Sequence, residues 1–308
     1  MIVDFNESLR NLSGLDSLIE ISGDLKIAHN DSLLNLSGLD NLEWVRGGLS
    51  LRLNNNLSSI SSLNHSIIKK SLRIEYNVNL TNLTGLENIT HIEGQCFIAG
   101  NTTLQNLLGL DNLFEIDESL VIISNDALSN LMELGNLASI GGILRIIDNQ
   151  TLTTLSGLDN IDANTISHLN IESNVLLSVC EIQSVCEYLM DSLGTVEISD
   201  NYLGCNSREE IEEACIVSVP ESRICKGVTV HPNPFKTSTT IKYELKHPAT
   251  VKIVFYNQVG KQVDVIEKRQ QNGLNHIEWV PDNLASGIFY FRLKAGQQVT
   301  VGKLVLMR

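Results

Sequence analysis

Residues 25–48 read LKIAHNDSLLNLSGLDNLEWVRGG, and this 24-residue pattern returns along the chain as far as residue 201. Its landmark is a pair of apolar residues, separated by one position, with asparagine three residues later. Two apolar side chains spaced in this way lie on one face of a strand. The landmark asparagines are 24, 23, 24, 24, 24, 25 and 27 residues apart, at Asn30, Asn54, Asn77, Asn101, Asn125, Asn149, Asn174 and Asn201.

This period predicts a solenoid. A single coil cannot bury its apolar residues, whereas stacked coils share one continuous core. We therefore expect a mainly β protein with short helices, in which about eight coils stack strand on strand. Between residues 61 and 70 the pattern departs from the repeat, because Ser62-Leu63 replaces the usual Gly-Leu step. This departure predicts a distorted coil and not a break in the solenoid.

The asparagine of each coil follows the strand, at a turn that leaves backbone N–H and C=O groups without ladder partners. A buried carboxamide has the donors and the acceptor that satisfy such groups and the equivalent asparagine of the next coil. We predict a structural asparagine ladder, with no role in ligand binding. Its members are Asn30, Asn54, Asn77, Asn101, Asn125, Asn149 and Asn174.

A second column is acidic and follows the Gly-Leu step. It comprises Asp16, Asp40, Glu87, Asp111 and Asp159. Stacking brings neighbouring members to about 5 Å, the spacing of adjacent strands. Carboxylates beside a turn accept local backbone N–H bonds, and a column of them also suits calcium. Both interpretations stay open at the level of sequence.

The strand pattern, the asparagine turn and the coil length together resemble leucine-rich repeats, most closely those of receptor L domains. The resemblance covers roughly residues 9–215. It implies a right-handed solenoid with a binding face. It names no ligand, because such solenoids bind many unrelated partners.

Residues 178–216 read as a C-terminal cap, with helical spacing of apolar residues and a capping box at Ser207–Glu210. The cap holds four cysteines, which favour disulfides in an oxidising compartment. A zinc site is the alternative, although neither C-x-x-C spacing nor a nearby histidine supports it. Four cysteines allow three pairings. Analogy with other repeat caps joins Cys180 to Cys205 and Cys186 to Cys215.

The period ends by residue 227, and six short alternating strands follow between residues 239 and 306. They predict an Ig-like antiparallel β-sandwich. The expected organisation is a solenoid with its cap over residues 1–216, a linker over 217–227 and a second domain over 228–308. The distribution of charge supports this division. From Lys226 onward the chain has 12 of its 22 basic residues and only 5 of its 36 acidic residues. The part before Lys226 therefore has 10 basic and 31 acidic residues.

Residues 228–308 are similar to the type A C-terminal sorting domain of the type IX secretion system. The landmarks are Pro232, Asn233, Pro234, Phe235, Gly260, Gly273, Trp279, Gly287, Tyr290, Arg292 and Lys303. The resemblance implies export across the outer membrane of a Gram-negative bacterium after a Sec step. It also implies the secretion machinery and a surface sortase as partners, the latter attaching the body to a glycolipid. An Ig-like adhesion module is the alternative.

Other classes of function find no support in the sequence. The acidic first domain argues against nucleic acid, because phosphate binding needs clustered Lys and Arg. No apolar stretch approaches the roughly 18 residues of a spanning helix. The first residues lack a signal-peptide pattern, so we expect the sequence to begin after its signal. The seven histidines show no metal spacing and no hydrolase or nucleotide motif occurs, so neither a cofactor nor catalysis is expected.

The expected function is therefore recognition or adhesion at the cell surface, with an unidentified protein or glycan as the partner. Outward strand positions form the expected contact surface. They are Lys26, Ser50, Arg73, Phe97, Val121, Arg145 and Asn170. One alternative is an accessory part of a larger secreted hydrolase whose catalytic domain precedes residue 1. Another is an intracellular scaffold, which paired cap cysteines would contradict.

Overall fold

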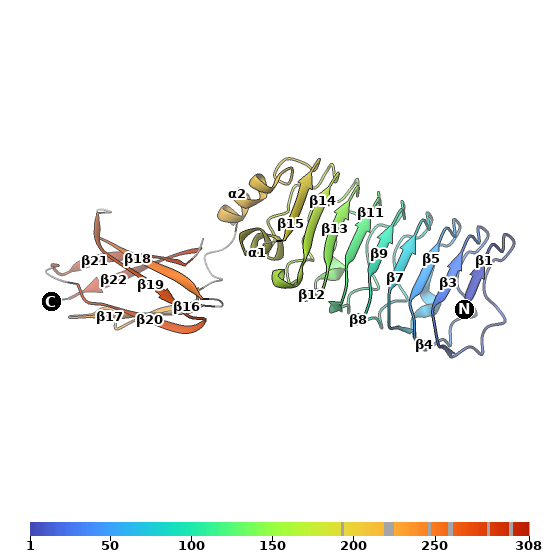
Figure 1. The fold of residues 1–308 in the computed structure, drawn as a ribbon, viewed down its shortest axis with the longest axis horizontal. Helices are drawn as coiled ribbons and strands as arrows, with labels where there is room; N and C mark the ends of the chain where they lie inside the picture. Colours follow the sequence, from blue (N-terminus) through green and yellow to red (C-terminus); the bar gives the residue numbers. More distant parts are fainter. Residues whose placement is uncertain are drawn as a thin grey trace. The chain divides into compact units, whose positions relative to one another are not determined.

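The computed structural model describes residues 1–191, 194–218, 225–245, 248–257, 261–281, 284–295 and 298–307. The apolar pairs of the repeat form one nine-stranded parallel sheet in which each coil adds the next strand (Figure 1). The strands are β1 (Ile2–Asp4), β3 (Leu25–Ala28), β5 (Leu49–Arg52), β7 (Leu72–Glu75), β9 (Cys96–Ala99), β11 (Leu120–Ile123), β13 (Ile143–Ile147), β14 (His168–Glu172) and β15 (Thr195–Ser199).

Two smaller parallel sheets of two-residue strands run along another side of the same coils. The first contains β2 (Glu20–Ile21), β4 (Trp44–Val45) and β6 (Ile67–Ile68), and the second contains β8 (His91–Ile92), β10 (Glu115–Ile116) and β12 (Ser139–Ile140). The second residue of each strand is buried. The first of each faces outward in a row across the coils. Each coil therefore brings the chain back to the same sheets, and the coils stack into a β-solenoid of about eight turns, as the period predicts.

Strand register explains the core. Leu49 pairs with Leu72, and Leu51 pairs with Ile74, so equivalent apolar residues of neighbouring coils stack directly. Their side chains are almost fully removed from solvent. Cys96 occupies one such position beside Leu72, and it is buried and unpaired. It fills space as a small apolar side chain.

In each coil, the residue just before the asparagine has a left-handed backbone conformation, and we call these residues the left-handed column. The residue just before each asparagine has a φ between 51° and 67°. The column comprises Phe5, His29, Leu53, Tyr76, Gly100, Ser124, Asp148, Ser173 and Asp200. This conformation is uncommon outside glycine, and here each coil adopts it where the strand ends and the asparagine turns inward.

Three short 3-10 helices vary the turns, at η1 (Ser61–Leu63), η2 (Met132–Leu134) and η3 (Ala163–Thr165). The first lies in the coil whose sequence departs from the repeat. That coil keeps both its strands, β6 and β7, so the departure is a local distortion as predicted.

The cap consists of α1 (Gln183–Asp191), β15 and α2 (Arg208–Ser218). Disulfides join Cys180 to Cys205 and Cys186 to Cys215, the pairing that analogy gave. The Ser207 hydroxyl accepts the Glu210 N–H over 3.2 Å at the start of α2.

The reciprocal bond of the capping box is absent there, which corrects the sequence interpretation. The Glu210 carboxylate accepts instead from the Gly204 and Asn206 N–H groups, over 2.8 Å and 3.0 Å. The turn before α2 supplies these donors, so the carboxylate fixes the turn to the helix.

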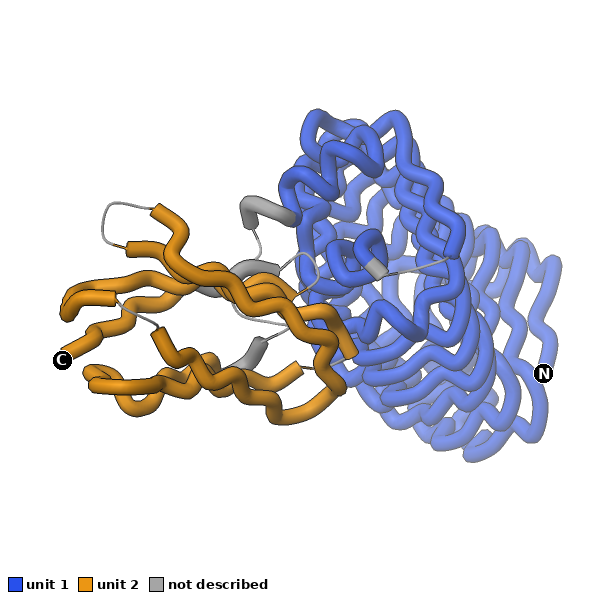
Figure 2. The backbone as a smooth tube through the Cα atoms, turned by 60° about the vertical axis from the view of Figure 1, so that its left-hand side comes forward, with its two compact units in different colours: residues 1–215 blue, residues 216–308 orange. Residues whose placement is uncertain are grey.

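The chain divides into two units, residues 1–215 and 216–308 (Figure 2). The C-terminal unit holds two antiparallel sheets, with strand orders β16-β17-β20 and β19-β18-β21-β22. Their bounds are β16 (Cys225–His231), β17 (Thr239–Leu245), β18 (Ala249–Asn257), β19 (Gln262–Gln270), β20 (Gly273–Trp279), β21 (Gly287–Ala295) and β22 (Gln298–Leu306).

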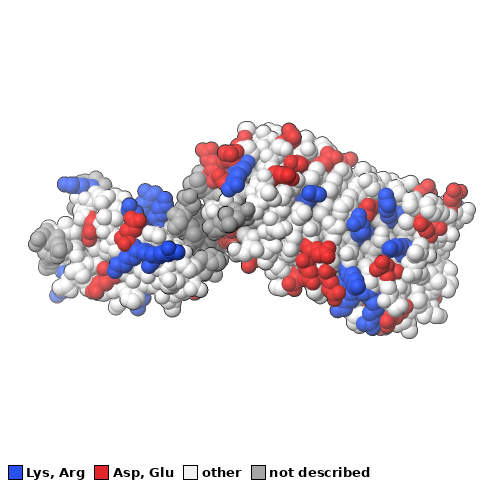
Figure 3. All heavy atoms as spheres, viewed as in Figure 1, with Lys and Arg blue, Asp and Glu red and all other residues white. Residues whose placement is uncertain are grey.

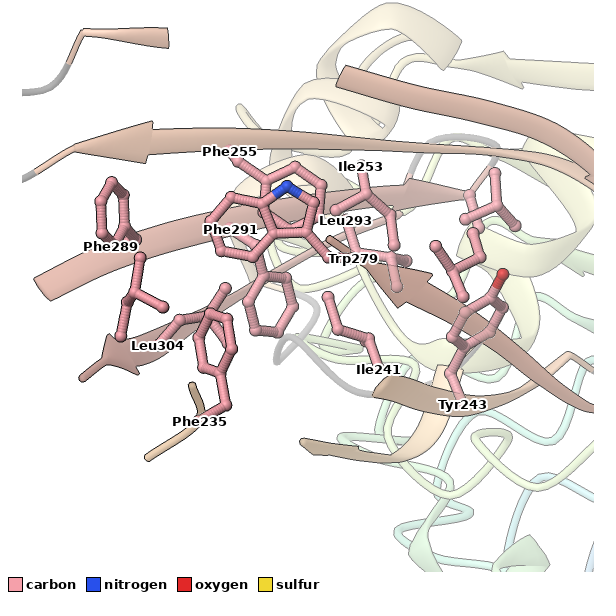
Figure 4. Packing of buried hydrophobic residues seen from close by; sticks show 14 of the residues in the cluster. Phe235, Ile241, Tyr243, Ile253, Phe255, Trp279, Phe289, Phe291, Leu293 and Leu304 are labelled. Carbon is pink, nitrogen blue, oxygen red and sulfur yellow. The ribbon is translucent and has the colours of Figure 1, made fainter. Parts of the chain in front are cut away.

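Both sheets contribute to one aromatic core (Figure 4). The Trp279 ring stacks on Phe255 at a centroid distance of 4.2 Å, and Phe235 and Phe289 each lie 5.8 Å from it. Its indole N–H donates to Asp264 over 2.9 Å, which satisfies its one polar atom.

Candidate functional site

Three consecutive coils at the N-terminal end of the solenoid form a groove with a volume of about 780 Å³. It lies beside the short strands β2, β4 and β6. The distorted coil contributes His65 and Ile67 to it. We call this site the Trp44 groove, after the one tryptophan of the solenoid. Its volume falls within the range of small-ligand sites, roughly 300–1,000 Å³.

The apolar part of the Trp44 groove is made by Ile19, Trp44 and Ile67. The Ile19 side chain is 55% exposed, and the other two residues are half-buried. The Arg46 guanidinium lies 4.7 Å from the Trp44 ring centroid, and its Nε donates to Glu20 over 3.0 Å. This pair positions Arg46 against the ring and lowers the pKa of Glu20.

The polar part carries three carboxylates, those of Asp16, Asp40 and Glu43, with Ser17, Asn41 and His65 beside them. The Gly38 N–H donates to Asp40 over 2.9 Å, and with a hydrogen bond from Ser62 it lowers the pKa of Asp40. Among the described residues that line the groove, none is Lys or Arg.

An ionised carboxylate only accepts hydrogen bonds. The groove therefore suits a ligand that supplies donors and an apolar surface, and it disfavours an anion.

The acidic column uses its carboxylates locally. Each accepts the N–H of the glycine two residues earlier, over 2.9 Å to 3.0 Å. The pairs are Gly14 with Asp16, Gly38 with Asp40, Gly85 with Glu87, Gly109 with Asp111 and Gly157 with Asp159. This is the turn-capping alternative of the two interpretations. Of the five, only Asp16 and Asp40 line the Trp44 groove.

The landmark asparagines hydrogen-bond from coil to coil. Within the series, the backbone N–H of one asparagine donates to Oδ1 of the next, over 3.0 Å to 3.3 Å. The Nδ2 atom also donates to a strand carbonyl of the preceding coil, as Asn101 does to Ile74 over 2.8 Å. The series ends at the cap, where Asn201 donates to the Cys205 carbonyl over 3.0 Å. The asparagines from Asn30 to Asn174 are buried, Asn201 is half-buried, and all of them hydrogen-bond to the backbone.

The outward row of the main sheet is less exposed than expected. Lys26 is exposed, but Val121 and Asn170 each retain only 4% of their accessible surface, so the expectation is wrong at these two positions. Val121 is a short side chain flanked in register by the longer Phe97 and Arg145.

Asn170 lies in register between Arg145 and Glu197, and its Nδ2 donates to the Glu197 carboxylate. The remaining positions, Ser50, Arg73, Phe97 and Arg145, are half-buried.

The sorting landmarks fall into two groups in the C-terminal unit. Phe235 and Trp279 are buried in its core, and Asn233 joins the start of the unit to β22. Its Nδ2 donates to the Lys303 carbonyl and its Oδ1 accepts the Val305 N–H, each over 2.8 Å. These landmarks support the fold.

Three other landmarks, Tyr290, Arg292 and Lys303, are exposed. Tyr290 and Lys303 are direct cross-strand partners, and Arg292 lies two positions further along β21. Residues two apart on a strand share a face, so the three form one surface on β21 and β22, which we call the β21 face. Pro232, Pro234, Gly273 and Gly287 lie in or beside the strands. Gly260 lies outside the described residues.

The Trp44 groove was not predicted from the sequence, although Asp16 and Asp40 belong to the acidic column. Its residues come from three coils at equivalent repeat positions, as Ser17, Asn41 and His65 do, and the stacking of the coils brings them together. The short coil at residues 54–77 was a further signal, because a distorted coil changes the surface beside it.

The chain is thus a β-solenoid protein with a C-terminal unit of two antiparallel sheets. Residues 229–307 match a known family, the secretion system C-terminal sorting domain. This tail suggests export by a type IX system, interaction with its machinery and a secreted or cell-surface location. The comparison with curated proteins gave no match. Within the described part of the chain, no helix is long and apolar enough to cross a membrane.

Proposed function

We propose that this chain is a non-enzymatic recognition protein, exported and anchored at the cell surface by its tail. Its solenoid is of the leucine-rich, receptor L domain type, and its tail is an Ig-like sandwich. The repeating Leu and Ile core and the asparagine series support the first assignment. The two antiparallel sheets around one core support the second.

The ligand site that we assign is the Trp44 groove, and the ligand that fits it best is a neutral glycan. Sugar rings present an apolar face that packs on an aromatic ring and hydroxyl groups that donate to carboxylates. Trp44 supplies the ring, while Asp16, Asp40 and Glu43 supply acceptors. Charged anionic glycans and phosphorylated ligands are repelled by these carboxylates. The composition of the groove is the observation that carries this proposal.

Trp44→Ala tests the assignment on a printed array of neutral and acidic glycans. We expect the whole chain to bind neutral glycans and the variant to lose at least about tenfold in affinity, since burying an aromatic side chain contributes more than 1.4 kcal/mol. Phe114→Ala is the matched control, because Phe114 is an exposed aromatic residue of another coil that does not line the groove. Equal loss in both variants, or binding of acidic glycans alone, would exclude the groove as the glycan site.

A protein partner is the other outcome that the test distinguishes. If no glycan binds, but the whole chain binds a surface protein that Trp44→Ala does not bind, the recognition role stands and the glycan assignment is wrong.

A further inference from the structure

A second cluster of functional side chains lies two coils further along the short-strand side. His91, Glu115 and Asp117 each direct one ligand atom to a common place, and these atoms all lie within 4.8 Å of one another. His91 Nε2 and Asp117 Oδ1 lie 2.8 Å apart. Among the described residues this is the one group of three or more such side chains with this geometry. We call it the metal triad.

Backbone register holds the metal triad in place. His91 begins β8 and is the direct partner of Glu115, which begins β10. The Asp117 N–H donates to the Ile92 carbonyl over 2.9 Å, which extends the ladder to Asp117. Residues 115 and 117 therefore share the outer face of the strand. His91 and Glu115 on paired strands, and Asp117 just after the end of β10, are thus held in place by backbone hydrogen bonds.

The surroundings of the metal triad are strongly acidic. Glu93 and Glu118 are exposed and add to the charge of Glu115 and Asp117. Figure 3 shows acidic side chains gathered over the part of the solenoid where β8 and β10 lie, next to a basic group. Like charges on neighbouring strands destabilise a sheet. Elsewhere arginine relieves this, as Arg46 does for Glu20, but no ion pair with Lys or Arg involves these four acids within the described residues.

From this geometry we propose that the metal triad binds a divalent transition metal of the zinc class. Zinc takes one histidine nitrogen at about 2.0 Å and carboxylate oxygens at about 2.0–2.2 Å, so its ligand atoms are about 3.4 Å apart in a tetrahedral site. Small rotations of exposed side chains bring the triad to that distance. Imidazole selects against calcium and magnesium, which prefer oxygen. The fourth position takes water or a donor from a bound ligand.

The pair His29 and Asp4 provides an internal comparison. Its Nδ1 and Oδ1 atoms are 2.9 Å apart, much like those of His91 and Asp117. It has no third ligand within the same reach among the described residues. A histidine and a carboxylate alone form a hydrogen-bonded pair, whereas the metal triad adds a second carboxylate.

Zinc chloride titration of the whole 308-residue chain by calorimetry tests the proposal. We expect one zinc ion at the metal triad, and at least about tenfold weaker binding in His91→Ala and Asp117→Asn, since even outer-shell changes cost 10–100-fold. His29→Ala is the control and should bind zinc as the wild type does. Cobalt(II) chloride should give a visible absorption band that His91→Ala abolishes.

Two results would overturn the proposal. One is the absence of zinc binding to the wild type, and the other is zinc binding that His91→Ala and Asp117→Asn leave unchanged. The circular dichroism of each variant without metal should match that of the wild type, because both side chains are exposed. Asp117→Asn retains the size of the side chain and decides the question if His91→Ala fails to fold.

Discussion

Nδ2 of Asn101 donates to Oδ1 of Asn125 in the next coil over 3.2 Å, while Oδ1 of Asn101 accepts the Asn77 N–H over 3.0 Å. The same Nδ2 donates to the Ile74 carbonyl over 2.8 Å. Asn101→Ala removes the acceptor of the buried Asn77 N–H and the side-chain donor to the Ile74 carbonyl, while Asn125 Oδ1 keeps the Asn101 backbone N–H. We expect the free energy of unfolding to fall by about 3 kcal/mol, since each buried unsatisfied group costs about 1–3 kcal/mol.

Urea unfolding followed by circular dichroism measures this loss, and Asn112→Ala is the control. Asn112 is an exposed asparagine whose Nδ2 donates to the Glu87 carbonyl over 2.9 Å. Water replaces this bond, so the control should lose less than about 1 kcal/mol. Similar losses in the two variants would show that the buried asparagine has no special role.

The stacked strands and the asparagine column were predictable because a coil of nearly constant length repeats the same residue types in phase. The left-handed column was not. Its members include Leu53, Tyr76, Gly100 and Asp148, which share no side-chain chemistry. The conformation comes from the strand end and the buried asparagine that follows, so no residue type signals it.

The candidate sites were hidden from sequence reasoning for a related reason. His91 and Asp117 are separated by 26 residues, one coil and two positions, whereas metal motifs are recognised by ligands a few residues apart. The Trp44 groove likewise draws on three coils. A search at the coil period, pairing each titratable residue with those about 24 positions away, would have found the metal triad.

Gly14 and Gly38 form a natural pair for testing how closely the coils approach. Their φ values are +104° and +108°, and each donates its N–H to the acidic residue two positions later. A Cβ at Gly14 meets nothing within 4 Å, but one at Gly38 overlaps the Leu12 carbonyl of the preceding coil. Alanine should therefore destabilise both through strain, and Gly38→Ala more.

We expect Gly14→Ala to lower the free energy of unfolding by about 1 kcal/mol, and Gly38→Ala by about 1–3 kcal/mol more, the usual cost of overpacking. Urea unfolding of the two variants side by side measures the difference. If the two losses are equal, backbone strain alone accounts for glycine at these two positions, and the contact between Gly38 and the Leu12 carbonyl has no effect on stability.

The buried thiol of Cys96 should be chemically inert. Burial raises its pKa from 9.0 to about 12, and the thiolate is the reactive form. At every pH below the raised pKa, Cys96 carries less thiolate than an ordinary cysteine, so its reactivity falls. In a Cys225→Ser background, Cys96 is the one cysteine outside the two disulfides.

Alkylation by iodoacetamide, located by peptide mass spectrometry, checks this expectation. As the pH rises from about 7 to 9, an ordinary thiol with a pKa of about 8.5 becomes largely thiolate and reacts more than tenfold faster, whereas native Cys96 should stay unlabelled throughout. Addition of urea should expose it and restore labelling. Rapid labelling of the native chain would contradict the burial of β9.

Removal of residues 228–308 should abolish surface display. The test uses the chain behind a Sec signal peptide in a bacterium with a type IX secretion system, and reads out protease accessibility on intact cells. The solenoid has its own core and cap disulfides, so the truncated protein should still fold and accumulate inside the outer membrane. Trp44→Ala in the full chain should be displayed normally. Display of the truncated chain would show that the tail is not the export signal.

Substitutions on the β21 face separate the recognition of the tail by the secretion machinery from the folding of the tail. Arg292 and Lys303 are exposed on the β21 face and contribute nothing to the core, so the double variant Arg292→Ala and Lys303→Ala should unfold at the same urea concentration as the wild type. If the secretion machinery reads this face, display should fall at least about tenfold, the effect of losing about 1.4 kcal/mol of binding. Lys242→Ala removes an exposed basic residue from the other sheet and should be displayed normally. Normal display of the double variant would mean that the machinery recognises another part of the tail, and unfolding of the variant would mean that the exposed landmarks also serve the fold.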